Sequence, residues 1–193
     1  SLHIMLLKLP AILCDMACGC LLFREASKRL HFSEMQSVCV ACAYLFQPAI
    51  ILNSSCWGQV DSVHTLVVIL MCLFLMDGKM LPAYAIYGIG VLLKPQTLIF
   101  TPVLLVGILD HIFLQDFSWR KFFYNLCGGL AVICGMLLLC VPFGLDAATS
   151  QYTSTLGSYE YAAVNAYNFW GLLGMNWVDQ NTIFLFLPCR TWG

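Results

Sequence analysis

Long apolar runs separated by short polar loops dominate the hydropathy pattern of this chain. Runs of this kind predict helices that cross a membrane, since about 20 apolar residues span the hydrocarbon core. The expected spans are residues 4–23, 35–52, 63–76, 81–93, 97–109, 122–143 and the start of a last one at 182–188. The pattern therefore predicts an all-α fold, a polytopic transmembrane helical bundle, with residues 1–193 as a single membrane-embedded piece.

The stretch 81–109 is longer than one crossing needs and is apolar except for Lys94, Pro95 and Gln96 in its middle. It is either one long tilted helix or two half-helices that meet around Lys94, because proline breaks the helical hydrogen-bond ladder. Arg120 and Lys121 mark the following loop as cytoplasmic. If that loop is cytoplasmic, the chain crosses the membrane an even number of times after the turn at Lys79. This favours the pair of half-helices over one long helix.

Basic residues predict the orientation of the bundle. The loop after the first span carries Arg24, Lys28 and Arg29, and the positive-inside rule places it in the cytoplasm. The nine residues 53–61 (NSSCWGQVD) then lie on the non-cytoplasmic side, together with Lys94 and a segment rich in tyrosine, tryptophan and asparagine. Polar groups so near a bilayer are costly unless they face a cavity, a partner or a substrate. We therefore place the functional site on this face.

Composition agrees with the membrane assignment. Hydrophobic residues make up 61% of the chain and charged residues 10%, with a mean hydropathy of +0.84, whereas soluble domains carry about 25% charged residues. A net charge of -1 gives no basic stripe for nucleic acid. Most of the 11 cysteines sit inside apolar runs, where thiols behave as small hydrophobes, and no histidine completes a zinc site. We expect neither a nucleic-acid partner nor a metal site built on these cysteines.

A lysine and several amides at one membrane boundary suit the phosphate or pyrophosphate of a lipid. Lys94 offers a point charge, and the side chains of Asn53, Gln59 and Gln96 can donate hydrogen bonds to phosphate or sugar hydroxyls. We expect the donor phosphate at Lys94, Gln96 and Gln59. The alternative for Lys94 is that it snorkels from a helix end toward the headgroups.

Aromatic side chains on the same face either stack on sugar rings or mark the headgroup level. They are Trp57, Tyr159, Tyr161, Tyr167, Phe169, Trp170 and Trp177. Asp61 has three interpretations: it binds a sugar hydroxyl, it caps the helix that begins near Ser62, or it orients Lys94.

The residues resemble the multi-spanning glycosyltransferases of the GT-C type, and among them bacterial membrane proteins similar to the second GPI mannosyltransferase. The resemblance covers residues 8–177. It rests on Lys8-Leu9-Pro10-Ala11-Ile12 with Asp15, on residues 44–49 (YLFQPA) running into NSSCWGQVD, on Leu93-Lys94-Pro95-Gln96 and on residues 167–174 (YNFWGLLG). The pairing of Trp57-Gly58-Gln59 and Asp61 with Lys94-Pro95-Gln96 is its most specific part.

The resemblance implies transfer of a mannose-like hexose from a polyprenyl-phosphate donor to an acceptor on the non-cytoplasmic side of a bacterial cytoplasmic membrane. The sugar or acceptor is expected near Asn53, Trp57, Asp61, Asn168 and Trp170. In GT-C enzymes the general base lies in the first non-cytoplasmic loop, which here would precede Ser1. We therefore expect a fragment truncated at both ends that is inactive alone. The residues name no cofactor and leave a requirement for a divalent metal open.

Two other functions fit parts of the pattern. A membrane transporter would also use intramembrane charges such as Asp61 and Lys94, and proline-broken half-helices are found in transporters. The polar groups gather on one side, however, and no repeat of the hydropathy pattern is visible. A non-catalytic subunit that binds lipid-linked sugars is the other alternative, and a carboxylate in the loop before Ser1 would favour the enzyme over it.

Overall fold

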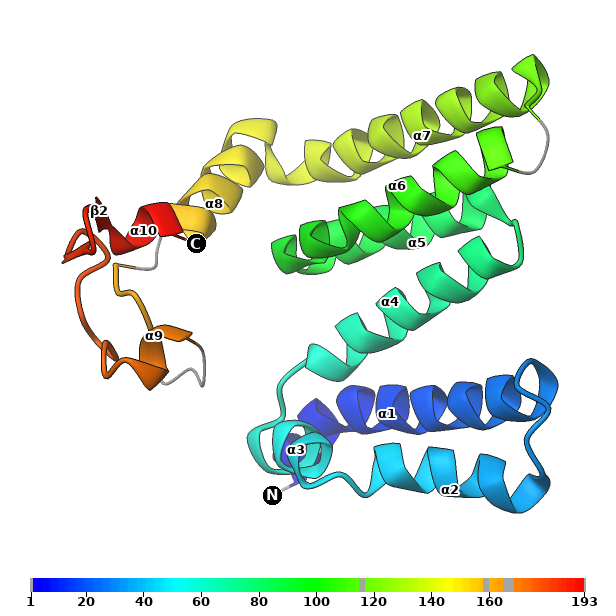
Figure 1. Ribbon diagram of the computed structural model, residues 1–193, viewed down its shortest axis with the longest axis horizontal. Coiled ribbons are helices and arrows are strands. Elements are labelled where there is room, and N and C mark those ends of the chain that lie inside the picture. The colour runs from blue at the N-terminus through cyan, green and yellow to red at the C-terminus, as the bar shows by residue number, and fades with distance from the viewer. Residues whose placement is uncertain (1, 115–116, 158–159, 165–168, 193) are drawn as a thin grey trace. The chain divides into compact units, whose positions relative to one another are not determined.

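The computed structural model describes residues 2–114, 117–157, 160–164 and 169–192. Its chain divides into two compact units, Ser1–Leu138 and Leu139–Gly193. The helices of the first unit are α1 (Leu2–Lys28), α2 (Glu34–Leu45), α3 (Pro48–Ile51), the π-helix η1 (Leu52–Trp57), α4 (Asp61–Met76), α5 (Met80–Leu93), the 3₁₀-helix η2 (Pro95–Phe100), α6 (Thr101–Leu109), the π-helix η3 (Asp110–Leu114) and α7 (Trp119–Cys140) (Figure 1).

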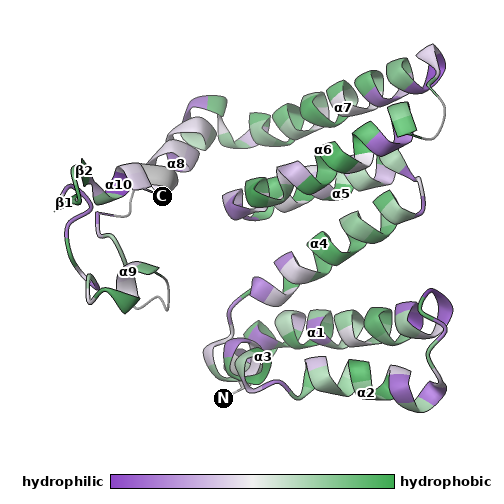
Figure 2. Ribbon diagram, viewed as in Figure 1, coloured by the Kyte–Doolittle hydropathy of each residue, from purple (hydrophilic) through white to green (hydrophobic). Residues whose placement is uncertain are grey.

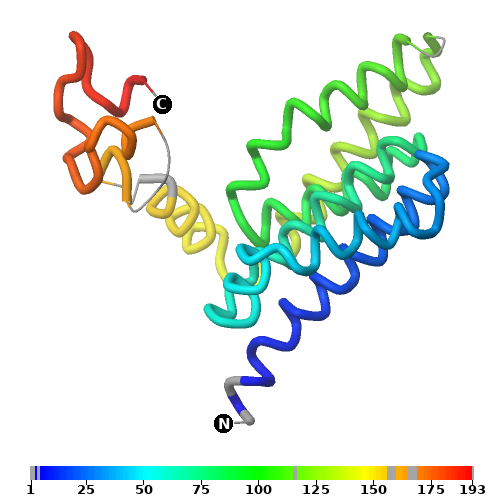
Figure 3. The backbone as a smooth tube through the Cα atoms, turned by 60° about the horizontal axis from the view of Figure 1, so that its bottom comes forward, coloured from blue at the N-terminus to red at the C-terminus, as the bar shows by residue number. Residues whose placement is uncertain are grey.

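The described residues confirm an all-α membrane protein. Three helical segments are long and apolar enough to cross a bilayer, namely Met5–Lys28, Pro95–Leu114 and Trp119–Phe143. The helices of the first unit run along a common direction (Figure 3), and hydrophobic colour covers most of their length (Figure 2). Many large apolar side chains point outward, as Leu7 and Leu114 do at 77% exposure each. Such side chains are compatible with a lipid environment, since lipid tails are as apolar as the side chains that they touch.

The second expected span, 35–52, is not one straight helix. Ser33 caps α2 through a capping box with Gln36, and the helix ends at Leu45. Gln47 is extended before Pro48, and α2 meets the α3–η1 segment at a bend of 48°. The residue before a proline disfavours the α conformation. The bend at Gln47–Pro48 therefore separates α2 from the helix that leads into the polar residues 53–61.

The stretch 81–109 changes direction at Lys94. Helix α5 ends at Leu93, Lys94 is extended with φ −152° and ψ 114°, and Pro95 begins η2, which leads into α6. Met80 and Tyr84 near the start of α5 share a buried cluster with Leu104 of α6. Helix α6 thus returns along α5. The placement of this pair in a membrane stays a prediction.

The core of the first unit lies among α4, α5 and α6, where the buried cluster also includes Met71 of α4. Glycines allow the close approach of these elements. A Cβ on Gly90 would lie 2.9 Å from Cγ2 of Thr97 in η2 and 2.9 Å from Cγ1 of Val67 in α4. Any side chain at position 90 would push η2 and α4 away from α5, so this glycine helps to set where Lys94 lies.

The second unit corrects one expectation. Residues 182–188, expected to begin a membrane helix, form an antiparallel hairpin of β1 (Ile183–Phe184) and β2 (Leu187–Pro188). Leu185 has a φ of 59°, which turns the chain back on itself and is incompatible with a continuing α-helix. The apolar run is short, and its Phe184 packs edge-on against Trp170 at 5.3 Å between ring centroids. The run therefore serves the local core of this unit.

The other elements of the second unit are short. They are η4 (Val141–Phe143), α8 (Leu145–Gly157), α9 (Phe169–Leu172) and α10 (Cys189–Trp192). Ala163, Trp170 and Cys189 form its buried cluster. Two isolated bridges, Tyr161 with Asp179 and Ala163 with Asn176, tie the segment before α9 to the segment after it.

Candidate functional site

An ion pair between Asp61 and Lys94 lies at the centre of the candidate site. Lys94 Nζ donates to Oδ1 of Asp61. Asp61 is the first residue of α4, and Lys94 directly follows the last residue of α5 as its C-cap. The two side chains are 38% and 33% exposed, so the pair is open to a ligand without being fully solvated. The pair joins the polar residues 53–61 to the turn at Lys94.

Of the three interpretations of Asp61, the structure bears on two. The N-cap of α4 is Val60, no side chain makes a cap hydrogen bond there, and Asp61 is inside the first turn. The capping interpretation is therefore wrong. The carboxylate instead contacts the ammonium of Lys94, the geometry expected if Asp61 orients that lysine. Its negative charge also suits the N-terminal end of a helix dipole.

A second link joins α4 to the segment after Lys94. The hydroxyl of Thr97 donates to the carbonyl of Lys94 at 2.8 Å. Because that hydroxyl has one proton, its contact of 2.9 Å with Nε2 of His64 requires Nε2–H to donate. Thr97 is buried at 1% exposure, so both bonds are shielded from solvent. Together with the ion pair they hold Lys94 against the first turns of α4.

The polar residues 53–61 are mostly helical rather than a loop. Leu52–Trp57 forms η1, and Gly58 ends it in the left-handed conformation with φ 72°. The amides of Gly58 and Gln59 donate to the carbonyl of Asn53. Short π-helical segments are rare and occur often at functional sites. Gly58 then turns the chain toward Gln59 and Asp61.

Lys8 of α1 holds the end of this π-helix. Its Nζ donates to the carbonyls of Ser55 and Cys56, each at 2.8 Å. The last carbonyls of a helix lack partners within it, and a lysine ammonium can satisfy them. The stem of Lys8 also lies against Gly58, where an added Cβ would stand 3.0 Å from Cγ of the lysine.

A buried carboxylate fixes the middle of η1. Asp15 of α1 is 6% exposed and accepts hydrogen bonds from Ser54 Oγ and, at 3.2 Å, from Tyr44 Oη of α2. Since Ser54 donates its proton to Asp15, the contact of 2.7 Å between Ser54 and Ser62 is donated by Ser62 of α4. One carboxylate thereby joins three helices and the π-helix.

The other site residues expected from the sequence are placed as follows. Trp57 is 79% exposed, Gln59 and Gln96 are exposed, and Asn53 is half-buried in η1. In the sequence, Gln59 is two residues from Asp61 and Gln96 is two residues from Lys94. Trp170 is buried in the second unit. Asn168 lies outside the described residues, as do Tyr159 and Tyr167. Within the described residues, no group of three His, Cys, Asp or Glu side chains could hold a metal ion.

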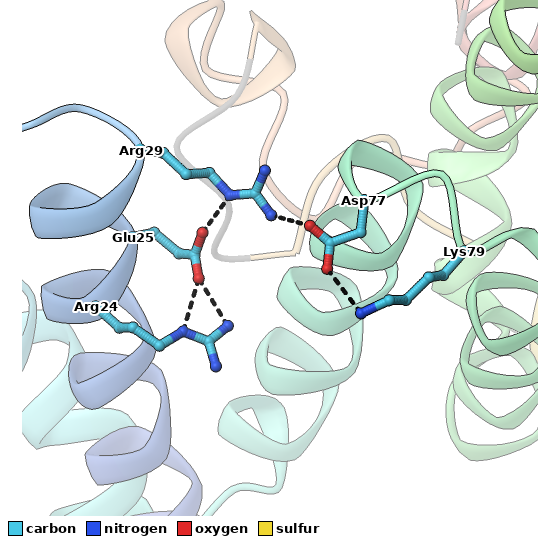
Figure 4. Close-up of polar contacts among 5 residues, drawn as sticks. All are labelled: Arg24, Glu25, Arg29, Asp77 and Lys79. Carbon is cyan, nitrogen blue, oxygen red and sulfur yellow. Dashed lines mark hydrogen bonds and ion pairs between the residues drawn. The ribbon is translucent and has the colours of Figure 1, made fainter.

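Charged residues gather at the C-terminal ends of α1 and α4, away from the Asp61–Lys94 pair. Arg24, Glu25 and Arg29 at the end of α1 connect through Asp77, at the end of α4, to Lys79 before α5 (Figure 4). The basic loop after α1, expected in the cytoplasm, therefore lies beside the turn between α4 and α5. Arg29, and then Lys79, hold the pKa of Asp77 below its ordinary value by hydrogen bonding to the carboxylate.

The segment with Arg120 and Lys121, also expected in the cytoplasm, lies at the same end of the first unit. Asn125, near the start of α7, donates to Nδ1 of His111 in η3 at 3.1 Å and to the carbonyl of Lys121 at 2.7 Å. Its Oδ1 accepts from Tyr84, near the start of α5. The bundle thus has one end with the basic loops and another with the Asp61–Lys94 pair.

Comparison with known proteins identifies the family of this chain. The family model of glycosyltransferase family 87 matches residues 3–186. The chain therefore belongs to glycosyltransferase family 87, and its apolar helices make it an integral membrane protein of that family. No curated protein and no solved structure matches the chain.

Sequence reasoning missed several groups that the structure brings together. In the sequence, Lys8 and Asp15 carry only the family resemblance, and the pattern assigns no role to Ser54, Ser62 or Thr97. One signal was present. Lys8 and Asp15 are two charged residues seven positions apart in an otherwise apolar span, which places them on one helical face. Charges inside a membrane span are functional candidates by default.

Proposed function

We propose that this protein transfers a mannose-like hexose from a polyprenyl-phosphate donor to an acceptor on the non-cytoplasmic side of the membrane. Membership of glycosyltransferase family 87 supports the transfer of a sugar. The observation that supports the donor class is the Asp61–Lys94 pair, in which a cation about one third exposed lies at the end of an apolar helix. A lipid-linked phosphate would bring an anion and an apolar tail to such a boundary together.

The reaction is a displacement at the anomeric carbon. An acceptor hydroxyl attacks that carbon, the bond from the carbon to the phosphate oxygen breaks, and a carboxylate takes the acceptor proton. The donor is a phosphodiester with one negative charge, whereas the departing polyprenyl phosphate is a monoester that gains a second. Negative charge therefore grows on the phosphate as the bond breaks, and groups that meet it there accelerate the reaction.

Lys94 is suited to that growing charge. Its ammonium has three donors, of which one is given to Asp61, and two remain for phosphate oxygens. Asp61 and the Thr97 bond to the Lys94 carbonyl fix the lysine before the donor arrives, which lowers the cost of ordering it. The amides of Gln59 and Gln96 are assigned to the same phosphate.

The sugar ring is assigned to the Trp57 side of the site. The indole is 79% exposed at the end of η1, and an exposed aromatic face can stack on the apolar face of a hexose. Asn53 is assigned a hydrogen bond to a sugar hydroxyl. Asn168 and Trp170 stay predictions for the acceptor side.

Donor competition with the full-length protein tests this function. Proteoliposomes that hold the protein and membrane acceptors are given either a radiolabelled polyprenyl-phosphate hexose or the matching nucleotide sugar. The proposal expects label on the acceptor only with the lipid-linked donor. Transfer from the nucleotide sugar alone would overturn the donor class, and transfer from neither would overturn the function.

A further inference from the structure

Helix α1 contacts η1 with two charged side chains from one face. Lys8 and Asp15 are seven positions apart, about two helical turns. Lys8 contacts the carbonyls of Ser55 and Cys56, while Asp15 accepts from Ser54. Three consecutive residues of η1 are therefore bound to a single stripe of α1.

These contacts determine more than the position of η1. The polar residues continue from Trp57 through the left-handed Gly58 to Asp61, and Asp61 is the partner of Lys94. A shift of η1 along α1 would move Trp57 and Gln59 relative to the ion pair. Ser62, bonded to Ser54, transmits the same constraint to the first turn of α4.

Lys8 differs from the cations of the first unit that take part in ion pairs. No carboxylate of the described residues lies within ion-pair distance of Lys8, and its two partners are neutral backbone carbonyls. A membrane protein does not need a charged residue only to fill space near the end of an apolar span, because the charge is costly there. The cost is offset by satisfying the two carbonyls that end η1.

Gly58 and Lys8 are a matched pair. The left-handed conformation at position 58 favours glycine, and a Cβ there would lie 3.0 Å from Cγ of Lys8. The turn thus needs glycine both for its own backbone and for the lysine stem beside it. Motion of either residue disturbs the other.

We propose that Lys8 is a positioning residue of the sugar-transfer site: its ammonium and stem fix the turn at Trp57–Gln59 so that these groups face the donor held by Lys94. Asp15 anchors the same π-helix one step earlier, through Ser54. This inference rests on the proposed function. Lys8 acts through Trp57, Gln59 and Asp61, and it transfers no proton and holds no part of the sugar.

The activity test compares four forms of the full-length protein in the same membranes: the parent, Lys8→Met, Lys8→Arg and Lys28→Met. Lys28 is an exposed lysine at the other end of α1 and serves as the matched control. We expect Lys8→Met to lower kcat/KM for the lipid-linked donor by up to about 100-fold, a loss that a misplacement of about 1 Å at a reacting centre can cause. Lys8→Arg should keep most of the activity, because a guanidinium can also donate to two carbonyls.

A split between KM and kcat separates positioning from a loss of folded protein. Loss of folded protein lowers the apparent kcat and leaves the donor KM unchanged, whereas a displaced Trp57–Gln59 turn raises the donor KM. Parent-like kcat/KM in Lys8→Met, or a loss that Lys8→Arg fails to restore, would overturn the inference while leaving the proposed function intact if the parent transfers sugar.

A fluorescence measurement tests positioning without any activity. In a variant with Phe at positions 119, 170, 177 and 192, Trp57 is the remaining tryptophan of these 193 residues. Acrylamide quenching of Trp57 should change when Lys8→Met is added and stay the same with Lys8→Arg or Lys28→Met. Unchanged quenching in Lys8→Met overturns the positioning role, even for a protein that transfers no lipid-linked sugar.

Discussion

Lys94 donates a charged hydrogen bond to Asp61 across 33 positions of the chain. The pair connects the end of α5 to the start of α4, and a second bond from His64 to Thr97 runs beside it. These two links hold the break at Lys94 in the stretch 81–109 against the first turns of α4. The site depends on contacts between elements that are far apart in sequence.

The first prediction concerns the strength of this ion pair. We expect Asp61→Asn and Lys94→Met to lower the thermal midpoint of unfolding singly, and the double variant to lose less than the sum of the two. The pair is about one third exposed, so the coupling should be about 1 kcal/mol or less. Strictly additive midpoints in a double-mutant cycle would show that the two residues are not coupled.

Thr97 gives a sharper effect on stability, because its hydroxyl is buried. Thr97→Val keeps the shape of the side chain but removes its hydroxyl. Nε2 of His64 then loses its acceptor, and the Lys94 carbonyl loses one of its donors. We expect a loss of about 1–3 kcal/mol in unfolding free energy. Thr97→Ser keeps the hydroxyl and serves as the control. If the two variants unfold alike in denaturant titrations, the hydrogen bonds do not stabilise this turn.

Two buried serines form a matched pair for testing the Asp15 network. Ser54→Ala removes a hydroxyl that donates to Asp15 and should cost about 1–3 kcal/mol, since a buried carboxylate loses a donor. Ser37 is equally buried, and its hydroxyl has no hydrogen-bond partner among the described residues. Ser37→Ala should therefore be near neutral or stabilising. Equal losses in both variants, by thermal unfolding in detergent, would contradict the network.

The charged cluster at the other end predicts a pH dependence. Hydrogen bonds from Arg29 and Lys79 lower the pKa of Asp77 from 3.8. When the pKa of a carboxyl is lower in the folded than in the unfolded state, its charge stabilises the folded state at any pH above the unfolded pKa. This stabilisation is lost as the pH falls through the folded pKa. The thermal midpoint of the parent should therefore exceed that of Asp77→Asn at neutral pH, and the difference should vanish only below pH 3.8.

Arg29→Gln is the companion variant for this pH series, because it removes the larger cause of the shift. In the Arg29→Gln background, the thermal midpoints with Asp77 and with Asp77→Asn are compared again. The pH at which their difference disappears should then move up toward 3.8. A difference that is the same at all pH values would mean that the Asp77 charge does not contribute.

The sequence was sufficient for the fold class, and it singled out Asp61 and Lys94, the two residues of the candidate site. Hydropathy runs predict the membrane helices because burial of apolar side chains in lipid depends on composition more than on partners. Asp61 and Lys94 were recognisable as charges beside a bilayer, and their contact was one of three interpretations offered for Asp61. The choice among these needed coordinates, since the ion pair joins residues of different helices.

Other features depended on backbone geometry that the hydropathy pattern does not encode. The run 182–188 is apolar enough for a membrane helix, but the positive φ of Leu185 makes it a hairpin. The apolar run 35–52 suggested one straight span, but the chain bends at Pro48. The polar residues that follow suggested a connection between helices, but residues 52–57 form a π-helix. The grouping of Lys8 and Asp15 on η1 required knowing which helix packs beside which.

The most direct test of the account is sugar transfer from a polyprenyl-phosphate donor by the full-length protein, comparing the parent with Lys94→Met and Asp61→Asn in the same membranes. Lys79→Met, at the opposite end of the first unit, is the control. The account predicts transfer by the parent and by the control, with kcat/KM reduced about 100-fold or more in Lys94→Met, the cost of losing one group that stabilises a transition-state charge. Asp61→Asn should be reduced less. Near-normal transfer by Lys94→Met would contradict the central claim that Lys94 binds the donor phosphate.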